Sequence, residues 1–130
     1  MKLIDTDIAI DHFHGNQSAR EFFAQALASG EPLYISVVTL TELLAGMRPG
    51  EEELTKKLLS LFTVIDVDNT IGRKVAEYLC QFSRSHKMEL GDALIAATAS
   101  AMGAELATRN IKHYPMNDIR ITAPYGRGRK

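Results

Sequence analysis

Short apolar segments alternate with longer amphipathic stretches through most of this chain, and this alternation limits the folds open to it. The short segments predict strands at residues 2–4, 33–37, 64–67, 105–108 and 119–122. The longer stretches predict a helix that starts at Asp5 or Thr6 and runs to about residue 14, and helices over residues 18–28, 39–47, 51–62, 70–86 and 92–102. Strands that alternate with helices favour an α/β fold of three layers, in which helices cover both faces of a mostly parallel five-stranded sheet.

Composition narrows the class of protein. The 130 residues suit a single domain, 1–130, and a hydrophobic content of 45% with 24% charged residues is ordinary for a soluble globular protein. No apolar run approaches the roughly 20 residues that span a bilayer, and no secretory signal is visible at the N-terminus. We therefore expect a cytoplasmic protein. The single Cys80 excludes an internal disulfide, and its apolar neighbours predict a buried structural thiol.

Polar groups stand at the edge of apolar runs in four segments, LIDTD, TLTELL, GDALIA and ATRN. Asp5, Glu42 and Asp92 have no Lys or Arg beside them that suggests a fixed ion pair, and carboxylates in such surroundings are costly to desolvate. Ligands of parallel sheets bind beyond the carboxyl ends of the strands, where strand order reverses. Asp5 follows the first strand and residues 108–110 follow the fourth, so one rim of the sheet is expected to gather these groups. Mutual repulsion of the acids there calls for a bound cation.

Each acid also has a simpler interpretation. Asp5 and Asp92 suit the role of helix N-caps, a position that Asp favours, and Glu42 suits that of a solvated helix residue. Asp7 fits a first-turn residue favoured by the helix dipole, and Asp11 fits a solvated acid. The combination of the acids, more than any one of them, indicates a metal-dependent site.

The order and context of these segments resemble PIN-domain nucleases, and most closely the VapC toxins of bacterial toxin–antitoxin pairs. The matching stretches are LIDTDIAIDHFHG, ISVVTLTELLAGM, LGDALIAATASAMGAELATRN and a closing HY, so the likeness runs from the first residues to about Tyr114. The resemblance implies a compact parallel sheet and an endoribonuclease that depends on Mg²⁺ or Mn²⁺. It also implies a VapB-type antitoxin that folds over the site, a homodimer, and higher toxin–antitoxin assemblies.

The resemblance assigns roles to individual residues. Asp5, Glu42 and Asp92 would hold the metal ion, partly through water, and the ion would activate a water against an RNA phosphodiester. Asn110 best matches the fourth catalytic position of the family. Where many relatives carry an acid three residues later, this chain has His113, which leaves one or two metal ions open.

Further residues are assigned supporting or binding roles. Thr6 and Thr108 either hydrogen-bond the acids or serve as a helix-start hydroxyl and a strand residue. Arg109 and Lys112 are the candidate RNA contacts, because RNA phosphates need cationic partners. A basic tail from about residue 126 carries the charges Arg127, Arg129 and Lys130, which either add RNA contacts or are solubilising, and the solubilising role is preferred.

Partner surfaces are less well marked in the sequence. Phe13, Phe22 and Phe23 either line an antitoxin groove or pack in the core. The long helix from Thr70 and the segment near Tyr114 and Pro115 are the candidate dimer surfaces. The family cuts transfer, ribosomal or messenger RNA in different members, and nothing in this sequence selects among them.

Two other functions remain open from sequence alone. One is a receiver-like phosphoacceptor signalling domain with Asp66 as the acceptor, although a Lys after the last strand is missing and Glu42 and Asp92 would have no role. The other is a catalytically silent PIN module that only binds partners. The three intact acids argue against it, whereas Asn110 and His113 keep it open.

Overall fold

The computed structural model describes residues 1–126, and within them five strands, six α-helices and one short 3₁₀-helix follow one another along the chain. Their order is β1 (Lys2–Ile4), α1 (Thr6–Phe13), α2 (Gln17–Ser29), β2 (Leu33–Ser36), α3 (Val37–Ala45), α4 (Glu52–Leu59), β3 (Thr63–Ile65), α5 (Asn69–His86), α6 (Leu90–Met102), β4 (Glu105–Ala107), η1 (Ile111–His113) and β5 (Ile121–Thr122). The predicted tail charges Arg127, Arg129 and Lys130 lie outside the described residues.

All strand pairs of the sheet are parallel within residues 1–126, and the strand order is β3-β2-β1-β4-β5. The first strand is therefore central, with β2 on one side and β4 on the other. Strand order reverses between β1 and β4, which makes this the topological switch point of the sheet. The predicted α/β class and the parallel five-stranded sheet are confirmed.

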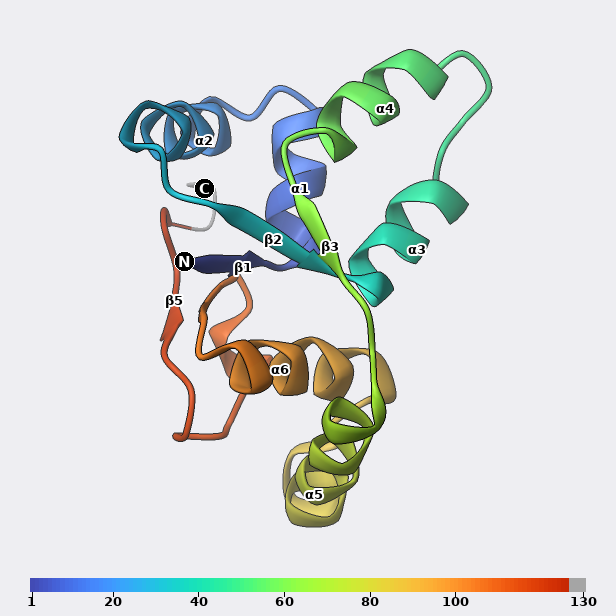
Figure 1. Ribbon diagram of the computed structural model, residues 1–130, viewed down its shortest axis with the longest axis vertical. Coiled ribbons are helices and arrows are strands. Elements are labelled where there is room, and N and C mark those ends of the chain that lie inside the picture. The colour runs from blue at the N-terminus through green and yellow to red at the C-terminus, as the bar shows by residue number, and fades with distance from the viewer. Residues whose placement is uncertain (127–130) are drawn as a thin grey trace.

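Helices cover both faces of the sheet (Figure 1). Because successive side chains of a strand point to opposite faces, Leu3 of β1 packs with α5 and α6, whereas Ile4 packs with α1 and α2. In β4, Leu106 likewise packs in the cluster with α5 and α6, and Ala107 packs in the cluster with α1 and α2. The predicted three-layer arrangement follows from this alternation.

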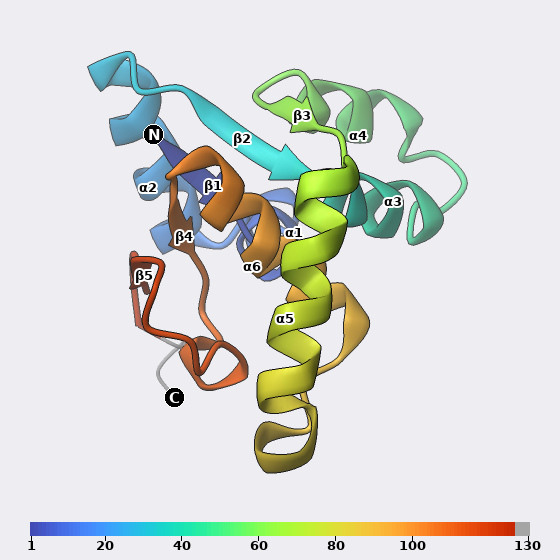
Figure 2. The same ribbon diagram turned by 60° about the horizontal axis from the view of Figure 1, so that its bottom comes forward.

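The sixth helix is an interior element, and this determines where its first turn lies. Six of its residues are buried, and small and apolar side chains occupy nearly its whole circumference. A helix that is apolar all round must be covered on several sides. The sheet covers one side of α6 and α5 lies along another (Figure 2). The N-terminal turn of α6 is thereby held at the carboxyl rim of the strands.

Some boundaries and two details differ from the sequence-based prediction. Helix α3 begins at Val37, directly after β2, because the Ser36 Oγ accepts a hydrogen bond from the Val38 N–H at 2.9 Å and caps it. Helix α6 begins at Leu90 with Glu89 at its N-cap, so the interpretation of Asp92 as an N-cap is wrong. Cys80 is exposed, and the prediction of a buried thiol is also wrong.

The exposure of Cys80 follows from the face that α5 buries. Ile71, Val75 and Tyr78 form the buried stripe of this helix, and Cys80 lies off that stripe. None of the helices in residues 1–126 is long and apolar enough to cross a membrane.

Candidate active site

Asp5 lies at the carboxyl end of the central strand, and its side chain is only 7% exposed. The Oδ1 atom accepts a hydrogen bond from the Thr6 N–H at 2.7 Å, which makes Asp5 the N-cap of α1 as well as a site residue. The Oδ2 atom accepts from the Thr108 hydroxyl at 2.7 Å and from the Tyr114 hydroxyl at 2.9 Å. Hydrogen bonds to a carboxylate are strong, so these donors compensate the cost of burying the charge.

Asp92 lies in the first turn of α6 and faces Asp5 across the Tyr114 hydroxyl. Its Oδ1 atom is 3.4 Å from the Tyr114 Oη, and its Oδ2 atom is 3.6 Å from the His113 Nδ1. Burial raises the pKa of the Asp92 carboxyl, the negative charge of Asp5 raises it further, and His113 opposes both. The structure thus brings together two of the predicted acids, at the switch point of the sheet.

Tyr114 is the residue that joins the two acids, and the sequence analysis assigned it only to a dimer surface. Its side chain is 3% exposed, so its ring and hydroxyl lie in the protein interior, and the dimer surface near Tyr114 and Pro115 stays a prediction. Burial and the charges of Asp5 and Asp92 raise the pKa of Tyr114 far above its ordinary range, which keeps the hydroxyl protonated as a donor. The only sequence signal for it is its place in the closing HY of the family pattern.

Glu42 is exposed on α3 and joins the site through Thr6. The Thr6 hydroxyl donates to the Glu42 Oε1 at 2.5 Å and lies 2.9 Å from the hydroxyl of the buried Thr39. Since the Thr6 N–H binds Asp5, one residue contacts both predicted ligands. Of the two interpretations left open for Thr6, the structure shows both: it starts α1, and it hydrogen-bonds the acids.

The loop after β4 is held against α1 by Asp7. The Asp7 Oδ2 accepts from the Arg109 N–H at 3.0 Å and from the Asn110 Nδ2 at 2.9 Å. The Asn110 N–H in turn donates to the Thr108 hydroxyl at 3.0 Å. Asp7 therefore does more than favour the helix dipole, because it fixes the segment that carries Thr108 and Asn110.

Asp11, one turn further along α1, pairs with Arg109. The Arg109 Nη1 lies 3.0 and 2.9 Å from the two oxygens of Asp11, which also accepts from the Tyr125 hydroxyl at 2.7 Å. The Asp11 side chain is 15% exposed, so its prediction as a solvated acid is wrong. Arg109 is thereby held in a partly buried ion pair, while Lys112 is exposed on η1.

The donor set suits a hard divalent cation with few protein ligands. Within residues 1–126, no three His, Cys, Asp or Glu side chains converge as a ready-made metal-binding group, and the Glu42 carboxylate is hydrogen-bonded to Thr6. Mg²⁺ typically takes one or two carboxylates and keeps several waters, which matches Asp5 and Asp92. Burial, and to a smaller extent the charge of Asp5, raises the pKa of the Asp92 carboxyl, and a cation bound there would favour its charged form.

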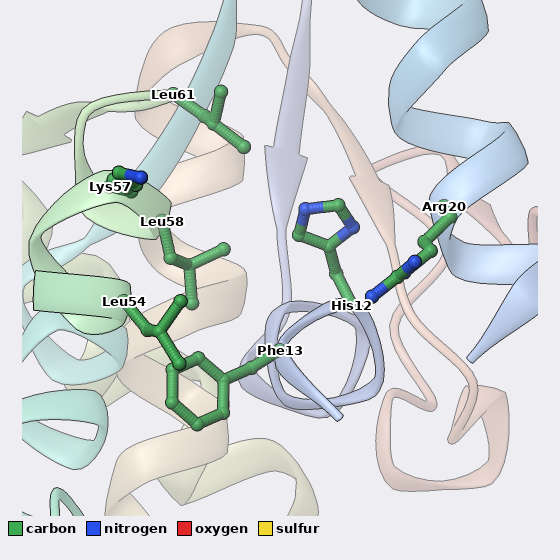
Figure 3. Close-up of a pocket in the computed structure, with 7 residues that line it drawn as sticks. All are labelled: His12, Phe13, Arg20, Leu54, Lys57, Leu58 and Leu61. Carbon is green, nitrogen blue, oxygen red and sulfur yellow. The ribbon is translucent and has the colours of Figure 1, made fainter. Parts of the chain in front are cut away.

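A groove beside the site runs between α1 and α4. One cavity of about 490 Å³ is lined by apolar side chains and three cationic or titratable ones (Figure 3), namely His12, Phe13, Arg20, Leu54, Lys57, Leu58 and Leu61. A second, of about 170 Å³, shares Phe13 and Leu58 with the first and reaches Glu42. Phe13 thus lines the groove, whereas Phe23 is fully buried in the core, and Phe22 packs partly buried against the same cluster.

The raised pKa of the Asp7 carboxyl allows a test of how Asp7 is buried against the loop after β4. Burial, followed by the charge of Asp5, raises this pKa to about 6. Because the folded protein then holds the proton more tightly than the unfolded chain, the contribution of Asp7 to stability is full below about pH 4 and is lost as the pH rises through about 6. We therefore expect Asp7→Asn to become more stable relative to the native protein as the pH rises from about 4 to about 6.5, and the difference between the two free energies of unfolding to stay constant above that pH. Both free energies are measured in urea with a chelator present. Parallel pH profiles of the two proteins would contradict this.

Comparison with known proteins assigns the chain to a family. The PIN domain model matches residues 2–117. The chain is 41% identical over 117 residues to "Ribonuclease VapC10" of Mycobacterium tuberculosis, with 89% of this chain and 87% of that protein covered. A toxin–antitoxin complex from Klebsiella pneumoniae contains a chain that matches with a TM-score of 0.75 and 29% identity, over 97% of this chain and 99% of that one.

The fold recurs at lower identity. A chain of the DNA-bound VapBC from Salmonella typhimurium superposes with a TM-score of 0.79 at 22% identity, over 93% of this chain and 96% of that one. The family-model match and the identity to a VapC protein both span most of the chain. This chain belongs to the PIN-domain family and, within it, to the VapC group.

Proposed function

We propose that this protein is a metal-dependent endoribonuclease that acts as the toxin of a VapBC-type pair and uses Mg²⁺ or Mn²⁺. The observation that carries the proposal is the pair of acids at the switch point, where Asp5 and Asp92 face one shared hydroxyl. Among the described residues, no Lys or Arg forms an ion pair with either acid. The VapC relative is itself named a ribonuclease, which supports the same chemistry here.

The metal would be held by Asp5 and Asp92, with Glu42 reaching it through water and Asn110 in a supporting role. When bound, such an ion lowers the pKa of a water and offsets negative charge on phosphoryl oxygens. Residues of this chain orient the carboxylates that would hold the ion. Thr108 and the backbone of Thr6 orient Asp5, and the Thr6 hydroxyl aims Glu42. With Arg109 paired to Asp11, the exposed Lys112 is the better placed of the two cations for RNA phosphate.

The signalling alternative has little support in the geometry. Strand β3 lies at the edge of the sheet, so Asp66, which follows it, is two strands away from the central strand that carries Asp5. Phosphoacceptor chemistry would leave the paired acids at the switch point without a role. A silent binding module differs from the proposed enzyme only in activity, and one assay separates the two.

Cleavage of RNA by the purified protein tests the proposal. Total cellular RNA is incubated with the protein in Mg²⁺ or Mn²⁺, and we expect cleavage that excess chelator stops. Asp5→Asn keeps the helix cap, and it should still lower the rate by more than the roughly 10–100-fold typical of outer-shell changes, as should Asp92→Asn. Asp66→Asn, an exposed acid outside the site, is the matched control and should cleave normally.

Retained cleavage in either site variant, or in excess chelator, would contradict the mechanism. Cleavage by none of the proteins would favour the silent module. Sequencing the 5′ ends of the fragments then identifies the RNA class and the cleavage site.

The proposed partner is an antitoxin segment seated in the groove between α1 and α4. Its apolar floor, Phe13, Leu54 and Leu58, suits an apolar side chain, and the nearby Arg20 and Lys57 suit an acidic neighbour (Figure 3). The second cavity leads from this groove to Glu42, so a bound segment would reach the active site. The homodimer and the higher assembly remain predictions that rest on the family.

Charge placed in the groove tests this docking surface. Leu54 is exposed on α4 and lines the larger cavity, and Leu54→Asp should repel an acidic segment and remove an apolar contact. We expect affinity for a co-expressed VapB-type antitoxin to fall roughly tenfold by calorimetry. Leu44→Asp, at another exposed leucine, which lies on α3 and lines neither cavity, is the control and should bind normally. Equal affinities of the two variants would rule out this groove.

A further inference from the structure

The Tyr114 hydroxyl has an unusual position for a group that family resemblance gives no role. It is buried with its side chain 3% exposed, and it lies 2.9 Å from the Asp5 Oδ2 and 3.4 Å from the Asp92 Oδ1. The backbone holds it there, since the Tyr114 N–H donates to the Ile111 carbonyl at 3.0 Å and closes η1.

Hydrogen-bond capacity shows what this hydroxyl does to Asp5. A carboxylate offers about four lone-pair positions. Thr108 and Tyr114 occupy those of Oδ2, and the Thr6 N–H takes one of Oδ1. The remaining position is on Oδ1, so the orientation of the carboxylate is fixed and one oxygen is left to face a ligand.

The same hydroxyl also separates the two acids. It has one proton, and the shorter distance directs that proton to Asp5, which leaves the phenolic oxygen against Asp92. The two carboxylates therefore meet across a polar group of fixed position rather than across open space. A site that is formed before the divalent cation binds must already hold its ligands at the right separation and in the right orientation.

We propose that Tyr114 is a positioning residue of the active site, whose hydroxyl orients Asp5 and sets its separation from Asp92 so that the pair is ready to take a divalent cation. The inference rests on the proposed function. Tyr114 acts through the two acids.

If Tyr114 had a purely structural role, loss of its hydroxyl would affect metal binding no more than loss of another buried hydroxyl. The chain contains a matched control for this comparison. Tyr78 is also buried, at 1% exposed, in the same core cluster, and its hydroxyl donates to the Asp118 Oδ1 at 2.9 Å, outside the site. Replacement of either tyrosine by Phe keeps the ring and removes one hydroxyl bound to a carboxylate. The two changes should therefore disturb packing alike and the metal site differently.

Calorimetric titration of the metal-free proteins with Mn²⁺ measures this difference directly. We expect Tyr114→Phe to bind Mn²⁺ about 10–100-fold more weakly than the native protein, and Tyr78→Phe to bind it normally. In RNA cleavage, Tyr114→Phe should lower kcat/KM at limiting Mn²⁺ and recover when Mn²⁺ is raised, whereas Tyr78→Phe should cleave normally at both concentrations.

Each result decides between the proposals. Native affinity in Tyr114→Phe, or an equal loss in both Phe variants, overturns the positioning role and leaves the proposed function intact. A native protein that binds no Mn²⁺ overturns the metal site itself, and this inference with it.

If Tyr114→Phe alone does not fold, the same change is made in the Asp92→Asn background. The neutral amide there removes the repulsion of Asp5, so the double variant should fold although Tyr114→Phe alone does not. A double variant that also fails to fold would overturn the proposal.

Discussion

A buried carboxylate at the end of the central strand is the interaction on which the rest of this structure depends. Asp5 gives up most of its hydration, and no cationic side chain among the described residues pairs with it. Three hydrogen-bond donors take the place of water, from the start of α1, the end of β4 and the residue after η1. Those elements must therefore meet at one point, and their meeting point is the carboxyl rim of the sheet.

A second set of contacts secures that meeting point. Asp7 and Asp11, one turn apart on α1, bind the backbone and side chains of the loop after β4. The loop is thus held by the same helix that Asp5 caps. One consequence is electrostatic: the charge of Arg109 is offset by Asp11 in a partly buried ion pair, and no Lys or Arg among the described residues pairs with Asp5 or Asp92. In the proposed enzyme, a metal ion would supply much of the attraction for RNA phosphate.

The sequence predicted the strands, the helices and the rim, because these depend on local periodicity and on a general rule of parallel sheets. Asp5 and Asp92 were found by their place at the ends of apolar runs. Tyr114 was missed, since its hydrogen bond to Asp5 joins positions 109 residues apart and no local pattern marks it. Asp11 and Cys80 were misjudged for a related reason. The burial of a helix residue depends on which face its neighbours cover, and that is decided by tertiary packing.

In the proposed enzyme, Asp5 and Asp92 together form a divalent-metal site. Anomalous diffraction from crystals of the native protein grown with Mn²⁺ tests it most directly. We expect an ordered Mn²⁺ between the two carboxylates, bound to Asp5 through Oδ1. An ordered Mn²⁺ elsewhere, or none at a Mn²⁺ concentration that saturates RNA cleavage, would contradict it.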